Sequence, residues 1–167
     1  MSADSSLAVT LRAVVEEDGP FLLELYKSTR PEMVALGWPP AQLEAFLKMQ
    51  LNGQQRSYEM QYPDAKHQII LFKGEEVGRL ITFSTEQEIR LADVALLPQH
   101  RNQGVGAFLV RELCMEAAQR NVPVRLQVSK FNPAMRLYER LGFKMLGESD
   151  THFQMEWRPI PPGDAGL

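Results

Sequence analysis

Cysteine is almost missing from this sequence, because Cys114 is the only one among 167 residues. No disulfide can therefore form within the chain, and the apolar helical pattern around Cys114 indicates a small buried hydrophobic residue. Apolar runs of ~18 residues, the length of a membrane-spanning helix, are also lacking. Met1–Leu11 has no basic segment followed by an apolar stretch, as a secretion signal would have. We expect a soluble, cytoplasmic protein with no membrane partner.

Charge of one sign is not in excess either. The 18 Lys and Arg residues against 21 Asp and Glu residues give a net charge of −3, and the pI is near 5.7. Neither nucleic acid nor an anionic lipid surface is therefore expected as a partner of the whole molecule. His67, His100 and His152 are scattered without the spacing of metal ligands, so no metal site is predicted.

Low-complexity blocks and repeats with periods of ~20–50 residues are absent as well. The apolar content of 44% is typical of globular proteins. The chain length suits one domain of ~150 residues, and the end of the chain is rich in Pro and Gly. We predict a single domain over residues 1–158, followed by a C-terminal tail over residues 159–167.

Hydrophobic periodicity predicts a mixed order of strands and helices. The predicted strands are Ala8–Val14, His67–Phe72, Val77–Ser84, Ile89–Leu97, Val122–Ser129, Phe143–Gly147 and Thr151–Trp157. The predicted helices run from Pro20 to about Arg30, from Leu43 to about Tyr58, over Gly104–Arg120, and from Asn132-Pro133 to Gly142. This order predicts an α/β (α+β) fold, with a mixed, largely antiparallel central sheet of about seven strands flanked by about four helices.

The segment from Leu96 to Ala107 leads from an apolar strand through a polar loop into a helix. The first amides of a helix lack backbone partners, and the helix dipole places partial positive charge there. Gly104 and Gly106 have no Cβ, so a ligand can approach those amides closely, and Arg101 adds a full charge. This pattern is typical of a site for phosphate or pyrophosphate.

Two common nucleotide-binding motifs do not fit this segment. A P-loop needs Lys and then Ser or Thr after its second glycine, and neither follows Gly106. A dinucleotide-binding fingerprint needs a third Gly or Ala where this chain has Leu109. It also needs an acidic residue on the next strand, which Val124–Val128 lacks. Both of these nucleotide motifs are therefore excluded.

Two motifs, taken in order, resemble those of the GNAT superfamily of N-acetyltransferases. The loop Arg101-x-x-Gly104-x-Gly106 is similar to the Arg/Gln-x-x-Gly-x-Gly/Ala loop of that family. The run 132–143, NPAMRLYERLGF, is similar to its second signature. The second motif begins 31 residues after Arg101, with a helix and a strand between them, as in the family. The order of elements over Val9–Trp157 is also similar, so the resemblance covers nearly the whole chain.

The resemblance implies that acetyl-CoA, or a related acyl-CoA, is the acyl donor and co-substrate. It places the pyrophosphate on the amides of the loop Arg101–Ala107, and the pantetheine arm along the strand Val94–Leu96 like an added strand. Asn132 would contact the cofactor, act as a helix N-cap, or do both. The implied cofactor-binding residues are Val94, Ala95, Leu96, Arg101, Asn102, Gln103, Gly104, Val105, Gly106, Ala107 and Asn132.

Acyl transfer to an amine needs a neutral amine, a polarised thioester carbonyl and a proton source for the departing thiolate. Tyr138 matches the tyrosine that protonates the CoA thiolate in many relatives; its helical spacing alone would also suit a core tyrosine. Some relatives carry a basic glutamate where this chain has Gln127, which cannot take a proton. Asp93, expected on the same strand face as Leu91, is either the base, acting directly or through water, or a structural carboxylate.

In relatives, the connector between the first two helices borders the acceptor cleft, and here it is Arg30–Pro40. The candidate substrate-binding residues are Glu32, a solvated or substrate-orienting charge, and Trp38. Trp38 and Tyr58 could line an acceptor pocket, but apolar packing explains both at least as well. We interpret the chain as an enzyme that transfers an acetyl group from acetyl-CoA to a primary amine of a small molecule, by direct attack in a ternary complex. A protein or peptide acceptor and a non-catalytic CoA-binding module stay open as alternatives, and the resemblance also allows a homodimer.

Overall fold

Seven strands and five α-helices follow one another over residues 8–160, the part of the chain that the computed structural model describes. The strands are β1 (Val9–Ala13), β2 (Lys66–Phe72), β3 (Glu75–Ser84), β4 (Ile89–Leu96), β5 (Val124–Ser129), β6 (Lys144–Glu148) and β7 (His152–Trp157). The helices are α1 (Gly19–Ser28), α2 (Pro31–Val34), α3 (Pro40–Gln61), α4 (Val105–Arg120) and α5 (Ala134–Arg140). Residues 1–7 and 161–167 lie outside the described part, so the limits of the predicted domain (1–158) and tail (159–167) stay predictions.

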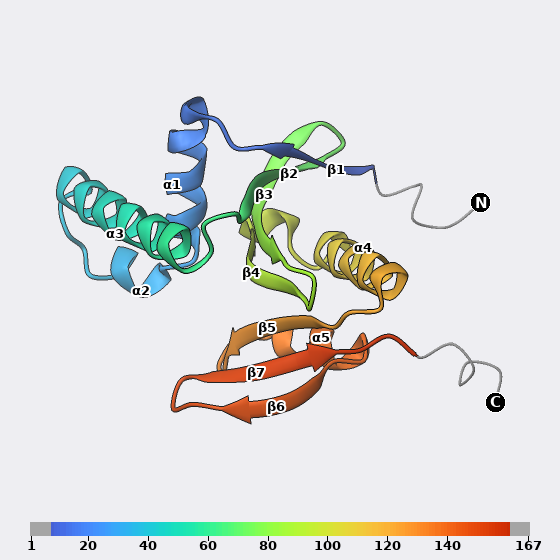
Figure 1. Ribbon diagram of the computed structural model, residues 1–167. Coiled ribbons are helices and arrows are strands. Elements are labelled where there is room, and N and C mark those ends of the chain that lie inside the picture. The colour runs from blue at the N-terminus through green and yellow to red at the C-terminus, as the bar shows by residue number, and fades with distance from the viewer. Residues whose placement is uncertain (1–7, 161–167) are drawn as a thin grey trace.

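The strands form one sheet in the order β1-β2-β3-β4-β5-β7-β6. Neighbouring strands are antiparallel except β4 and β5, which run parallel. A parallel pair needs a crossover connection, and α4 supplies it here. The prediction of a mixed, largely antiparallel α/β sheet is therefore confirmed. Figure 1 shows how the sheet divides at this pair, with β1–β4 in one half and β5, β7 and β6 in the other.

Helices pack against both faces of the sheet. Figure 1 shows α1 and α3 on one side of the β1–β4 half and α4 on the other. Consecutive residues of β2 divide between two apolar clusters: Ile69 packs with α1 and α3, and Ile70 belongs to the larger cluster around α4. This alternation is the period of two that a strand buried on both faces must have. Cys114 is buried in the larger cluster, where burial raises the pKa of its thiol to about 11.

One extra residue in β4 changes the face on which its side chains lie. Two adjacent residues of β3 pair with Leu91 and Asp93, so the intervening Ala92 forms a β-bulge. Leu91 and Val94 consequently both pack against the α4 cluster, whereas Asp93 lies on the α3 side with its ion-pair partner. The expectation that Asp93 shares a face with Leu91 is wrong, because a bulge shifts the alternation of a strand by one residue.

The connector expected after α1 contains the short helix α2. Pro31 begins it at a position where proline is favoured, and Glu32 lies in its first turn, beside the positive end of the helix. The following helix, α3, begins at Pro40 and reaches Gln61, so it is longer at both ends than the predicted range. The apolar spacing that predicts α3 ends at Leu51. The helix continues with polar residues because its second half lines the cavity described below.

Candidate active site

The first turn of α4 is open to a ligand. No side chain caps its N-terminus, where Gly104 precedes the helix. Within residues 8–160, the backbone amides of residues 102–107 have no backbone acceptor. Several unpaired N–H groups therefore lie together at the positive end of the helix dipole, an arrangement suited to a phosphate or pyrophosphate group.

Backbone conformation explains why small residues stand in this loop. Asn102 has a φ of 62° and Gly104 a φ of 86°, both in the left-handed region that glycine and asparagine tolerate best. Gly106 is in the helix, and a Cβ built there would meet only Leu137 Cδ2 of α5, at 3.9 Å. The open turn of α4 thus lies directly beside α5, which carries the second sequence motif.

The side chain of Arg101 turns back toward the end of β4. Its Nε donates a hydrogen bond to the carbonyl oxygen of Leu96 at 3.0 Å. This contact leaves the terminal guanidinium nitrogens available to an anion, next to the amides of the α4 turn. Arg101 therefore connects the anion-binding turn with the strand along which the resemblance places the pantetheine arm.

A gap opens between β4 and β5 beyond their short paired region. Ile89–Leu91 pairs with Val124–Leu126, and no pairing follows within the described chain, although β4 continues to Leu96 and β5 to Ser129. The bulge at Ala92 begins this separation, because bulges bend the strand that carries them. This edge of β4 therefore lacks a partner strand, so an extended ligand can pair with it, except at the Ala92 and Leu96 carbonyl oxygens that accept from side chains.

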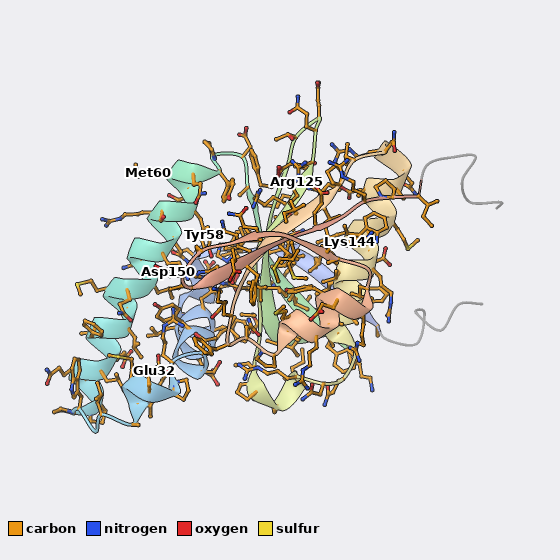
Figure 2. All side chains as sticks on the ribbon, turned by 90° about the horizontal axis from the view of Figure 1, so that it is seen from below. Glu32, Tyr58, Met60, Arg125, Lys144 and Asp150 are labelled. Carbon is orange, nitrogen blue, oxygen red and sulfur yellow. The ribbon has the colours of Figure 1, made fainter. Side chains whose placement is uncertain are left out.

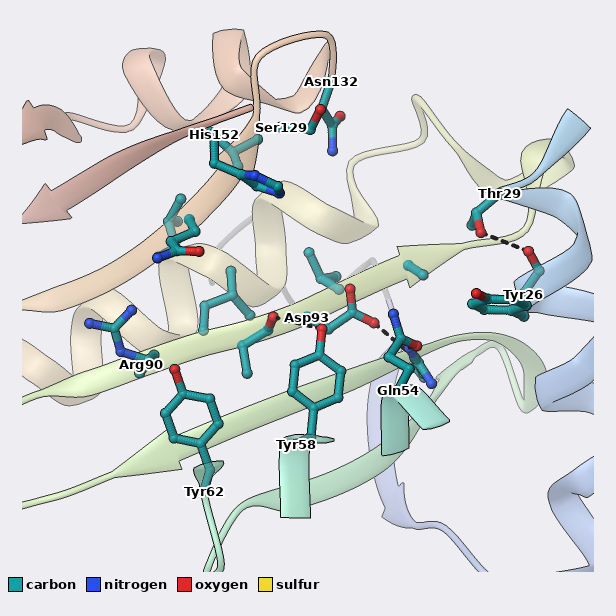
Figure 3. Close-up of a pocket in the computed structure, with 18 of the residues that line it drawn as sticks. Tyr26, Thr29, Gln54, Tyr58, Tyr62, Arg90, Asp93, Ser129, Asn132 and His152 are labelled. Carbon is teal, nitrogen blue, oxygen red and sulfur yellow. Dashed lines mark hydrogen bonds and ion pairs between the residues drawn. The ribbon is translucent and has the colours of Figure 1, made fainter. Parts of the chain in front are cut away.

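The gap continues into a cavity of about 520 Å³. Its walls are the C-terminal end of α1, the second half of α3, and the separating strands β4 and β5, and Figure 3 shows these elements around the cavity. The polar and aromatic residues that line it are Tyr26, Thr29, Arg30, Gln54, Tyr58, Gln61, Tyr62, Arg79, Arg90, Asp93, Gln127, Ser129, Asn132, Tyr138 and His152. Both predicted catalytic residues, Asp93 and Tyr138, are therefore brought to one cavity.

Tyr138 enters the cavity wall from α5. It is buried, with its ring 5.6 Å from the ring of Phe143, and no partner between residues 8 and 160 hydrogen-bonds its hydroxyl. Burial, and then the negative charge of Asp93, raise the pKa of Tyr138 to about 12. The phenol thus keeps its proton over the whole neutral and mildly alkaline range, and can donate it as a hydrogen bond to an anion that forms in the gap.

Asp93 is held by a buried arginine. Arg79 Nε donates to Asp93 Oδ2 at 2.8 Å, and Arg79 Nη2 donates to Gln54 Oε1 of α3 at 2.6 Å. The side chain of Arg79 is only 5% exposed, whereas that of Asp93 is 26% exposed. The ion pair fixes the orientation of the Asp93 carboxylate. Its other oxygen, Oδ1, has no hydrogen-bond partner among residues 8–160.

Tyr58, which the sequence left open as a pocket or packing residue, lines the cavity, and sequence reasoning missed its neighbours Gln54 and Tyr62. Figure 3 shows the side chains of Gln54 and Tyr58 in α3, and of Tyr62 directly after it, extending toward the strand that carries Asp93. The Tyr58 hydroxyl lies 3.5 Å from the carbonyl oxygen of the bulged Ala92. Burial first, and then the charge of Asp93, raise the pKa of Tyr58 to about 12.

A signal for these residues exists in the sequence. The sheet-facing stripe of α3 begins as Leu43, Leu47 and Leu51, and the same helical spacing then continues with Gln54 and Tyr58. Polar residues on a core-facing stripe indicate a cavity rather than packing.

Asn132 binds the first amide of α5 and lines the cavity, and its contact with the cofactor stays a prediction. Its Oδ1 accepts a hydrogen bond from the amide of Ala134 at 2.9 Å, as a cap of α5, and its side chain also lines the cavity. His152, at the start of β7, lines the same region, and its Nδ1 lies 2.7 Å from Thr151 Oγ1. Figure 3 shows Asn132 and His152 across the gap from Asp93.

The two predicted substrate residues are not in the cavity wall. Trp38 packs edge-on against Phe46, with ring centres 5.4 Å apart, in the cluster under α1 and α3. Figure 2 shows Glu32 on α2, far along the helical layer from Tyr58, which lies on the sheet-facing side of α3. Their roles in substrate binding stay predictions, and Arg30 is the connector residue that does line the cavity.

Within residues 8–160, no helix is long and apolar enough to cross a membrane, and no cluster of three His, Cys, Asp or Glu side chains could hold a metal ion.

An anion-binding helix start, an open strand edge and a polar cavity follow one another in this molecule. Together they suit an extended ligand with a phosphate group at one end. Residues 63–145 match the family model of the acetyltransferase (GNAT) domain. The chain belongs to the GNAT acetyltransferases, enzymes that transfer an acyl group from acyl-CoA to nitrogen.

Solved structures of several acetyltransferases have the same fold. The PaiA N-acetyltransferase of Thermoplasma acidophilum, in complex with coenzyme A, has a TM-score of 0.64 at 18% identity, with 91% of this chain and 99% of that chain covered. An acetyltransferase of Thermus thermophilus has a TM-score of 0.65 at 18% identity, covering 91% and 97%. The ribosomal-protein-S18-alanine N-acetyltransferase of Escherichia coli has a TM-score of 0.61 at 18% identity, covering 93% and 97%. A comparison with the curated proteins finds no match.

Proposed function

We propose that this chain transfers an acetyl group from acetyl-CoA to the primary amine of a small molecule, by direct attack in a ternary complex. The observation that carries the proposal is the arrangement of three parts: the α4 turn, the β4 edge to which Arg101 connects it, and the cavity that contains Asp93 and Tyr138. The cavity volume of about 520 Å³ lies within the ~300–1,000 Å³ of small-molecule sites.

Acetyl-CoA is bound through two of its parts, the pyrophosphate and the pantetheine arm. The amides of residues 102–107 and the free nitrogens of Arg101 bind the pyrophosphate, and the open edge of β4 pairs with the pantetheine amides over Val94–Leu96. The thioester then lies where β4 and β5 separate. Backbone N–H groups of the free β4 edge donate to its carbonyl oxygen and stabilise the negative charge that develops there.

The chemical step forms one bond and breaks one. The lone pair of the neutral amine attacks the thioester carbon, a C–N bond forms, and the C–S bond breaks with its electron pair on sulfur. The proton that the attacking nitrogen loses and the proton that the thiolate gains balance, so a neutral amine gives an amide and free CoA thiol. An ammonium substrate must first release a further proton.

Tyr138 stabilises the departing thiolate. A phenol with a pKa of about 12 is a weaker acid than a thiol, whose ordinary pKa is about 8.5. Tyr138 therefore acts first as a hydrogen-bond donor to the thiolate sulfur, and complete protonation follows from solvent.

Asp93 receives the proton of the amine, directly or through a water molecule. Its ion pair with Arg79 uses Oδ2, which leaves Oδ1 for the nucleophile. Gln127, also in the cavity wall, has no basic atom and can only orient the acceptor.

The proposal is tested by incubating the full chain and acetyl-CoA with a panel of small amines and short peptides, and following thiol release and the mass of each product. We expect acetylation of a small amine that saturates with acceptor. Acetylation of peptide N-termini or lysines alone would assign the chain to the protein acetyltransferases instead. Binding of acetyl-CoA without any product would contradict the proposed function.

A further inference from the structure

Positive side chains outnumber negative ones around the cavity. Among residues 8–160, three arginines line it, and Asp93 is its single carboxylate. Arg79 and Asp93 neutralise one another at 2.8 Å. The charge of Arg90 is already paired, because its Nε lies 3.1 Å from Glu88 Oε2. A cation therefore remains at Arg30, which forms no ion pair within the described chain.

Arg30 is held in place by neutral groups. Its Nη1 donates to the carbonyl oxygen of Thr29 at 3.2 Å and to Thr29 Oγ1 at 3.3 Å. Its guanidinium carbon lies 4.6 Å from the ring centre of Tyr26, a cation–π contact. Nε and Nη2 are left without hydrogen-bond partners among residues 8–160. Those two nitrogens form the edge of a guanidinium that matches a carboxylate or a phosphate with two parallel hydrogen bonds.

Arg30 also lies within electrostatic reach of the chemistry. The charges of Arg30 and Asp93 act on the same Tyr58 hydroxyl, with opposite effects on its pKa. Figure 3 shows Tyr26 and Thr29, the residues that hold Arg30, at one end of the cavity, with Asp93 near its centre. A molecule that reaches Asp93 with its amine can therefore extend its other end toward the α1 end of the cavity.

We propose that the acceptor amine carries an anionic group, a carboxylate or a phosphate, which Arg30 binds while the amine lies at Asp93. This inference rests on the proposed function and names the class of its acceptor. Arg30 is then a specificity residue that contributes to binding of the acceptor and not to the chemical step. Diamines and polyamines are poor acceptors, because a second ammonium would lie against Arg30 with no free carboxylate to receive it.

The test compares matched acceptors on the full chain with saturating acetyl-CoA. Glycine, β-alanine, γ-aminobutyrate and δ-aminovalerate are each compared with their carboxamides, which keep the amine and the length but lose the charge. Aminoethylphosphonate and aminopropylphosphonate distinguish a phosphate-type group from a carboxylate, and putrescine represents the diamines. We expect kcat/KM to be at least tenfold higher for the acid than for the carboxamide at the best length, and lowest for putrescine.

Two variants assign this preference to Arg30. Arg30→Gln is expected to raise KM for the anionic acceptor at least tenfold, with kcat and the Kd for acetyl-CoA within twofold of the parent and KM for the carboxamide unchanged. Lys27→Gln removes a charge from the exposed side of the same helix end, so it controls for a general effect of charge at the end of α1. It is expected to leave all four values unchanged.

The outcomes separate the two proposals. Equal kcat/KM for acids and carboxamides, or a KM that Arg30→Gln raises equally for both, overturns the anionic acceptor while acetylation itself stands. Peptides with acidic N-terminal segments as the only acceptors also overturn it. Binding of acetyl-CoA with no acetylation of any amine overturns the proposed function, and the anionic acceptor with it.

Discussion

Tyr138 and Asp93 lie far apart in the sequence, and the fold places both beside the β4–β5 gap. The charge of Asp93 acts on Tyr138 and adds to the effect of burial on its pKa. Each residue can therefore be tested for one proton transfer. Tyr138 is tested for the proton donated toward sulfur, and Asp93 for the proton removed from nitrogen.

Replacement of Tyr138 by Phe tests the first of these. The change keeps the ring that packs on Phe143 and removes only the hydroxyl, which has no hydrogen-bond partner within residues 8–160. We expect kcat to fall about 10- to 100-fold, because the thiolate loses its donor, while the Kd for acetyl-CoA and the Tm stay close to the parental values. Since the pKa of Tyr138 is about 12, the parental rate should show no decline due to this residue between pH 6 and about pH 10. A parental turnover rate in the variant would make Tyr138 a packing residue.

Replacement of Asp93 by Asn tests the second proton. The amide still offers an oxygen to Arg79 Nε but cannot accept a proton. We expect kcat/KM to fall at least tenfold near pH 7, where the amine is mostly protonated, and the difference to shrink toward pH 10, where free amine is abundant. A loss of the same factor at every pH would identify Asp93 as a structural partner of Arg79.

The same substitution also has an expected cost in stability. It leaves the guanidinium of Arg79, which is 5% exposed, without a carboxylate. Because Asp93 itself is partly exposed, we expect a loss of about 1–3 kcal/mol in the free energy of unfolding, below the range for fully buried pairs. Denaturant unfolding measures this loss, and it must be known before the kinetic result is interpreted.

At the scale of secondary-structure elements, the start of α4 is the predicted anion site, and its amides have no backbone partner within residues 8–160. Gly104 is a poor position for testing it, since its φ of 86° strains any other residue. Gly106 lies in helical backbone with room for a Cβ, so a substitution there affects the ligand more than the fold.

Gly106→Val should weaken acetyl-CoA binding at least tenfold, because its branched side chain lies beside the amides that bind the pyrophosphate. Gly106→Ala is the matched control, and a smaller effect is expected since its single methyl group meets only Leu137 at ordinary contact distance. Calorimetry with acetyl-CoA measures both affinities, and Tm reports the fold. Parental affinity in Gly106→Val would place the pyrophosphate elsewhere.

Most secondary-structure elements can be predicted from the sequence, but two of their features cannot. Alternation, helical spacing and turn residues predict the strands and α1, α4 and α5, because these elements follow regular local patterns. The bulge at Ala92 is not predictable in this way, since no Gly or Pro marks it, and it reverses the face of Asp93. The second half of α3 has no apolar stripe either, because its sheet-facing side borders a cavity rather than the core.

The candidate site also has a part that can be predicted from the sequence and a part that cannot. The donor side is predicted residue by residue, from amides and glycines at fixed spacing in the α4 loop and from the family resemblance for β4 and Asn132, and it stays a prediction. The acceptor side is assembled from α1, α3, β3 and β7, which are far apart in the sequence. Arg30 and Arg79 can be recognised as cavity residues only when the fold brings these segments together.

At the scale of the whole molecule, a half-buried histidine links stability to pH. His67 in β2 has a buried Nε2 without a hydrogen-bond partner among the described residues. Burial first, and then the charge of Arg79, lower its pKa to about 4 from an ordinary value of 6.5. The folded state binds fewer protons than the unfolded state between these values, so stability falls as the pH drops from about 6.5 to about 4.

His67→Gln removes this titration and keeps a polar side chain of similar length. We expect the parent to lose up to about 3 kcal/mol of unfolding free energy between pH 7 and pH 4, and the variant to lose clearly less over the same interval. Urea unfolding at several pH values measures both curves. Identical pH dependence in parent and variant would assign the acid sensitivity to other groups.

The central claim is that one path holds acetyl-CoA by its pyrophosphate and presents its thioester to an amine in the cavity. The most direct measurement is the acetyl-CoA-dependent acetylation of γ-aminobutyrate and its homologues by the parent, Gly106→Val and Tyr138→Phe proteins, followed by thiol release and product mass. The account predicts an N-acetylated product from the parent, a raised KM for acetyl-CoA in Gly106→Val, and a lowered kcat with unchanged acetyl-CoA binding in Tyr138→Phe. Normal acetyl-CoA binding by the parent with no acetylated amine, or equal kinetics in all three proteins, would contradict it.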